Sequence, residues 1–93
     1  MIDLTDMEIV FTGKLASMPR KQAFAVASAF GALPKAQVTQ QTNYLVVGAI
    51  HKTIGEPLTT RKLDIPDIKH ITEKDFIDWC QWKLSIWKNN LNN

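Results

Sequence analysis

Two short apolar segments constrain the fold more than any other feature of the sequence. Residues 7–12 (MEIVFT) and 44–47 (YLVV) are rich in β-branched and aromatic side chains. The second is apolar at successive positions, which is typical of a central strand buried on both faces of a parallel sheet. Parallel strands need crossover connections, usually helices, so the two segments predict an α/β fold.

Proline and glycine mark a helix after the first strand. Pro19 suits the first turn of a helix over residues 20–30, with Ser17 or Met18 as its cap. Gly31 follows directly, and glycine reaches positive φ without strain, as the position after a helix requires.

Residues 32–38 predict a weak strand at a sheet edge, because Pro34 cannot donate to a ladder. A loop is expected over residues 48–56. Pro57 then opens a short predicted helix that reaches residue 63.

A brief strand is expected at residues 68–71, and a last helix follows it to about residue 88. Thr72 and Asp75 have the spacing of a capping box, in which a hydroxyl and a carboxylate three residues later satisfy the first N–H groups. The predicted order is therefore βαββαβα, with a small, mainly parallel sheet covered on both faces.

Length and composition predict one domain over residues 1–93, with its core over residues 7–88 and flexible tails at 1–6 and 89–93. No apolar run has the ~20 residues of a membrane span, and the acidic start differs from a signal peptide. Cys80 is the only cysteine, so no internal disulfide forms. We expect a cytoplasmic protein, or a nuclear one in a eukaryote.

Charge is segregated along the chain. Residues 11–63 carry seven basic residues and only Glu56, a net charge of +6, whereas residues 64–80 carry −3. A basic stretch of this length favours an anionic partner such as phosphate or nucleic acid. The alternative is that these are ordinary solvated side chains.

Four segments, in their order and spacing, resemble the BRCT domain family, most closely the BRCT domains of bacterial NAD-dependent DNA ligases and large clamp-loader subunits. The segments are Thr12-Gly13-Lys14-Leu15, the helix from Pro19 to Gly31, residues 42–48 (TNYLVVG), and residues 72–80, with Phe76 at the family's usual Trp position. The resemblance implies a four-stranded parallel sheet with one helix on one face and two on the other. It also implies a non-catalytic module of DNA replication or repair, without a cofactor, that binds a 5′-phosphorylated DNA end.

The resemblance assigns the phosphate-contacting hydroxyl to Thr12 and the backbone N–H to Gly13. These residues end a strand at the edge where open parallel sheets bind ligands, and Lys14 adds a cation. The alternative is that they only form a tight turn.

The second-helix cation of the family maps to Thr60, Arg61 or Lys62, with Arg61 as the first choice. Arg20 and Lys21 would assist along the DNA backbone or remain solvated.

Neither metal nor catalytic chemistry is predicted. His51 and His70 lie far apart in the sequence and have no paired ligand spacing. Cys80 falls on the core face of the last helix, where we expect an inert buried thiol. Leu15 stands where a nucleotide-binding loop needs Ser or Thr.

The last helix presents two apolar faces at about 100° per residue. The predicted core face consists of Phe76, Ile77, Cys80, Leu84 and Trp87. Trp79, Trp82 and Ile86 form a second ridge, which could contact a protein partner or a second copy of the chain. The alternative is that Trp79 flanks the core and the chain end, with Leu91, covers Trp82.

Three functions remain open from the sequence. The first is DNA-end recognition, and the second is a protein–protein adaptor that uses the ridge. The third is an accessory role to a DNA ligase, or membership of one, with the catalytic parts elsewhere.

Overall fold

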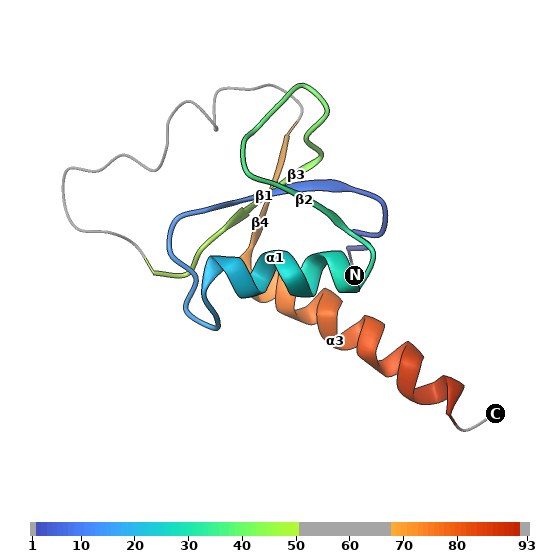
Figure 1. Cartoon of the computed structure of the whole chain (residues 1–93). Helices are drawn as coiled ribbons and strands as arrows, with labels where there is room; N and C mark the ends of the chain where they lie inside the picture. Colours follow the sequence, from blue (N-terminus) through green and yellow to red (C-terminus); the bar gives the residue numbers. More distant parts are fainter. Residues whose placement is uncertain (1, 51–67, 92–93) are drawn as a thin grey trace.

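Four parallel strands form the sheet of this computed structural model, which describes residues 2–50 and 68–91 (Figure 1). The strands are β1 (Glu8–Thr12), β2 (Leu33–Lys35), β3 (Tyr44–Val47) and β4 (Lys69–Thr72). Their order in the sheet is β2-β1-β3-β4. The predicted α/β fold is confirmed, with the Pro34 strand at an edge and β3 in the interior.

Two described helices, α1 (Arg20–Ala29) and α3 (Glu73–Asn90), pack on the same face of the sheet (Figure 1). The helix predicted over residues 57–63 lies outside the described residues. Thr72 caps α3 through the predicted capping box, because its hydroxyl accepts from the Asp75 N–H. Pro19 itself is the N-cap of α1, so the prediction of Ser17 or Met18 is wrong. Gly31 has φ +101°, as its place after the helix requires.

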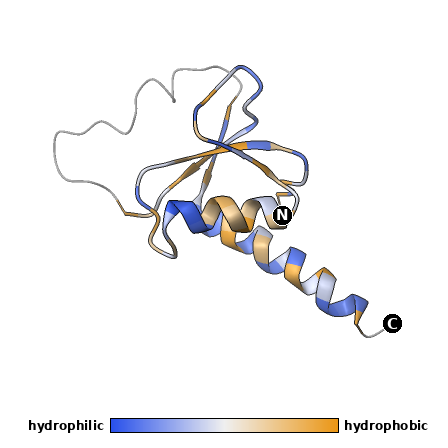
Figure 2. Cartoon of the chain, viewed as in Figure 1, coloured by the Kyte–Doolittle hydropathy of each residue, from blue (hydrophilic) through white to orange (hydrophobic). Residues whose placement is uncertain are grey.

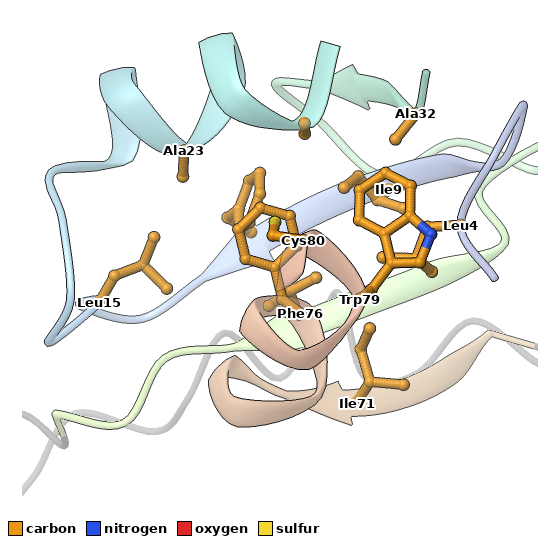
Figure 3. Packing of buried hydrophobic residues seen from close by; sticks show 12 residues of the cluster. Leu4, Ile9, Leu15, Ala23, Ala32, Ile71, Phe76, Trp79 and Cys80 are labelled. Carbon is orange, nitrogen blue, oxygen red and sulfur yellow. The ribbon is translucent and has the colours of Figure 1, made fainter. Parts of the chain in front are cut away.

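The core lies between the sheet and these two helices (Figure 3). Ile9 and Phe11 of β1 point toward the helices, and the small side chains of Ala23 and Ala27 let α1 approach them closely. The Phe11 ring meets the Phe76 ring edge-on, with centroids 5.1 Å apart. Neighbouring residues of a strand face opposite sides, so Val10 and Leu45 lie on the other face, where both are fully buried.

Trp79 is a core residue and does not belong to an exposed ridge. It is fully buried, with its ring centroid 6.1 Å from that of Phe30 and 6.3 Å from that of Phe76. Its Nε1–H donates to Asp3 Oδ1 at 3.2 Å. Trp79 is about 60° around the helix from Phe76, close enough to the core face for the N-terminal segment to cover it. The partner-interface prediction is therefore wrong for Trp79.

The first residues of the chain are also part of the packed structure. Leu4 is fully buried in the core, and the Asp6 N–H donates to the Gly31 carbonyl at 2.8 Å. The prediction of a flexible tail over residues 1–6 is therefore wrong for the described residues 2–6.

The distal half of α3 extends past the sheet (Figure 2). Its 18 residues span about 27 Å, whereas the four-residue strands β3 and β4 span only about 13 Å. Leu84 and Trp87, predicted as core, are 56% and 47% exposed for this reason. The helix ends at Asn90, two residues beyond the predicted end.

Replacing Trp79 and Trp82 separately by Ala tests this packing. Trp79→Ala empties a fully buried site and should lower the free energy of unfolding by about 3–5 kcal/mol. Trp82, which is 38% exposed on the same helix, is the matched control and should change it by less than about 1 kcal/mol. Urea unfolding followed by circular dichroism measures both, and equal losses would contradict the assignment of Trp79 to the core.

Candidate functional site

The ends of β1 and β3 lie side by side at one edge of the sheet. The Gly48 N–H donates to the Thr12 carbonyl at 2.8 Å, and the Ile50 N–H donates to the Lys14 carbonyl at 3.0 Å. Gly13, between them, turns the chain at φ +76°. Gly48 must lack a side chain, because a Cβ there would lie 2.4 Å from the Lys14 carbonyl oxygen. Two glycines thus permit this close approach of the two loops.

Arg20 folds back onto the loop that follows β1. Its Nη2 donates to the Gly13 carbonyl oxygen at 2.7 Å. Lys14, Arg20 and Lys21 are all exposed, and within the described residues none of them forms an ion pair. No described side chain caps the amino end of α1, where the helix dipole favours an anion. The three cations and this helix end form what we call the basic edge.

Some of the predicted site residues therefore lie close together, whereas others lie outside the described residues. Thr12 ends β1, Gly13 and Lys14 begin the loop that follows it, and Arg20 is hydrogen-bonded to this loop. Thr12 is only 1% exposed, so its side chain belongs to the interior. The predicted second-helix residues Thr60, Arg61 and Lys62 lie outside the described residues.

A buried carboxylate, which the sequence analysis did not identify, holds this edge together. Glu73 Oε1 accepts from the N–H groups of Ala16 at 2.8 Å and Ala49 at 3.0 Å. Its Oε2 accepts from the Ser17 N–H at 2.7 Å and from the Ser17 hydroxyl. Glu73 is 5% exposed. One side chain thereby ties the β1–α1 loop, the segment after β3 and the start of α3 to each other.

The hydrogen bonds of Glu73 keep it ionised despite its burial. Burial alone raises the pKa of this carboxyl, but the donors from Ser17, Ala16 and Ala49 outweigh it and lower the pKa to about 2. The N–H groups of Ala16, Ser17 and Ala49 are consequently occupied from within. An external anion at this edge would therefore meet Lys14, Arg20 and Lys21.

The local sequence signal for Glu73 was weak. It stands in the first turn of α3, where an acidic residue is common for dipole reasons alone. The parallel sheet explains why Glu73 reaches the β1–α1 loop. Because the strands run parallel, α3 starts at the carboxyl end of β4, at the same edge as the end of β1.

Residues 2–50 and 68–91 contain no cluster of three or more His, Cys, Asp or Glu side chains placed to hold a metal ion. Burial raises the pKa of the Cys80 thiol to about 11, so it is protonated and unreactive at neutral pH. None of the helices described is long and apolar enough to span a membrane.

The Glu73→Gln variant tests the carboxylate. The amide replaces one acceptor oxygen with a donor that faces other donors, so we expect a loss of about 3 kcal/mol in the free energy of unfolding at pH 7. The native pKa is depressed, so this stabilisation is complete above pH 4.5 and is lost as pH falls toward 2. The stabilities of the two proteins, measured by urea unfolding across this range, should converge in acid. A difference that does not depend on pH would contradict this role.

The sequence and the fold are each similar to those of known proteins. No family model matches the sequence. The chain is 42% identical over 75 residues to a DNA ligase of Dehalococcoides mccartyi strain BAV1, which covers 81% of the chain and 10% of the ligase. It is 36% identical over 76 residues to a DNA ligase of Hydrogenobaculum sp., which covers 80% of the chain and 10% of that ligase. The chain thus spans about a tenth of the curated relatives it matches.

The fold is similar to a solved structure, the C-terminal BRCT domain of human XRCC1. The TM-score is 0.52 at 10% identity, over 94% of this chain and 80% of that one. The similarity in structure establishes the fold, and the sequence similarity is to a short segment of bacterial ligases. Together they agree with the predicted resemblance: the chain has a BRCT-like fold and is similar in sequence to a short segment of bacterial DNA ligases.

Proposed function

We propose that this BRCT-like chain is a non-catalytic recognition module of DNA replication or repair, which binds the 5′-phosphate at a DNA end. The similarity to a segment of DNA ligases supports DNA as the class of ligand. Any joining chemistry would belong to other domains or other proteins.

The basic edge is the observation that carries this proposal. Arg20 uses one of its five N–H donors on Gly13, which fixes the guanidinium at the loop and leaves the others for an oxyanion. The nearby carboxylate of Glu73 points inward to its own donors. The edge therefore presents Lys14, Arg20 and Lys21 to the exterior.

The burial of Thr12 changes the roles that we propose for the site residues. Since Thr12 is buried, it supports the loop from within, and Gly13, Lys14 and Arg20 make the phosphate contacts. Lys21 assists along the DNA backbone. Arg61 or Lys62, outside the described residues, remains in the proposal as a further cation. Contacts of this kind do not read bases, so little sequence specificity is expected.

Binding to a short labelled duplex tests the proposal. A duplex with a 5′-phosphate should bind more tightly than the same duplex with a 5′-hydroxyl, and rising salt should weaken binding. Arg20→Ala should weaken binding to the phosphorylated duplex at least about tenfold and remove the preference, because a charge-assisted bond contributes about 1.5–3 kcal/mol. Fluorescence anisotropy at two salt concentrations measures both effects.

Lys69→Ala provides the matched control for this experiment. Lys69 is exposed, but it stands at the amino end of β4, opposite Tyr44 and away from the basic edge. This variant should keep the preference for the phosphate. Equal binding of both duplexes by the unaltered chain would overturn the proposal.

A protein–protein adaptor is the second candidate. Trp82 and Ile86, the two remaining residues of the predicted ridge, are 38% and 37% exposed on α3. An apolar contact would not weaken with salt, whereas binding to DNA phosphates would.

A further inference from the structure

The distal half of α3 exposes an unusual amount of apolar surface for a helix of this size. The large apolar side chains exposed there are Trp82, Leu84, Ile86, Trp87 and Leu91. In Figure 2, hydrophobic and hydrophilic residues alternate along α3 where it extends beyond the sheet. The sheet cannot cover them, because the helix has already passed its edge.

Three of these residues form a single stripe. Leu84, Trp87 and Leu91 follow Cys80 at spacings of four, three and four residues, which keeps all four on one side of the helix. This is the spacing of a seam between two paired helices. Cys80 is buried in the chain's own core, so the distal stripe, Leu84–Trp87–Leu91, continues the core face into solvent.

One residue of the stripe, Trp87, packs against the body of the domain. The Trp87 ring lies against the Phe30 ring at the end of α1, with centroids 4.8 Å apart and planes inclined at 44°. Trp87 is nevertheless 47% exposed, and Leu84 and Leu91 are 56% and 86% exposed. A partner would thus meet a large aromatic side chain whose orientation is already fixed, which lowers the entropy lost on binding.

We propose that the distal stripe pairs with the distal stripe of a second copy of this chain. A two-fold contact needs the same surface on both partners, and a helix stripe of this spacing can pack against itself. Its exposed apolar area is on the order of 350 Å² per copy. Homodimer interfaces are about 65% apolar, so the total interface would be on the order of 1,100 Å², the size of a weak, reversible dimer.

The positive charges near the stripe should oppose this pairing. Residues 79–93 contain Lys83 and Lys88 and no acidic residue, so pairing brings like charges together. Salt screens that repulsion and should strengthen the dimer, the opposite of its effect on DNA binding. The stripe also lies about 16–27 Å from Glu73 along α3, from Leu84 to Leu91. The dimer therefore leaves the basic edge open and does not depend on the proposed DNA function.

Analytical ultracentrifugation of the full chain over a range of concentrations tests the pairing. The average mass should rise from monomer toward dimer, and more readily at higher salt. Leu84→Glu places a charge in the seam and should weaken the dimer at least about tenfold. Leu84 is 56% exposed in the monomer, so the variant should keep its fold, which circular dichroism checks.

Ser85→Glu is the matched control, since Ser85 is exposed and the variant introduces the same charge one residue away, on another side of the helix and outside the ridge. It should dimerise about as well as the unaltered chain. A mass that stays monomeric at every concentration would overturn the proposal. Equal dissociation by both variants, or a dimer that weakens with salt, would also overturn it.

Discussion

The Glu73 carboxylate is the interaction on which the candidate site depends. It is the point where the β1–α1 loop, the segment after β3 and the start of α3 meet, and its oxygens accept from three backbone N–H groups and one hydroxyl. Loops at the edge of a small sheet have few apolar contacts to order them, so these bonds take that role. The positions of Gly13, Lys14 and Arg20 follow from the loop that Glu73 holds.

The two ends of α3 have different characters. Its first turn joins the polar edge of the sheet through Glu73 and the Thr72–Asp75 capping box, and its middle supplies Phe76 and Trp79 to the core. Its last turns leave the body and expose apolar side chains. One helix thus separates the basic edge from the apolar distal stripe, and salt should act on the two proposed contacts in opposite directions.

Local sequence patterns predicted the strands, the edge position of Pro34, the Thr72 cap and the Gly31 turn, because each depends on neighbouring residues. The contacts of Glu73 with Ala16 and Ser17 and of Trp79 with Asp3 join residues more than fifty positions apart, so periodicity could not reveal them. The exposure of the last turns depends on helix length relative to strand length. The sequence of the helix alone therefore could not show which of its turns extend beyond the sheet.

Nuclear magnetic resonance of the labelled chain, titrated with the phosphorylated duplex, locates the residues that contact the DNA end. The amide signals of Gly13, Lys14 and Arg20 should shift, and they should shift less with the 5′-hydroxyl duplex. The signals of Leu84 and Leu91 should remain in place at low protein concentration. Unmoved signals at the basic edge, together with shifts confined to α3, would contradict DNA-end binding at the basic edge.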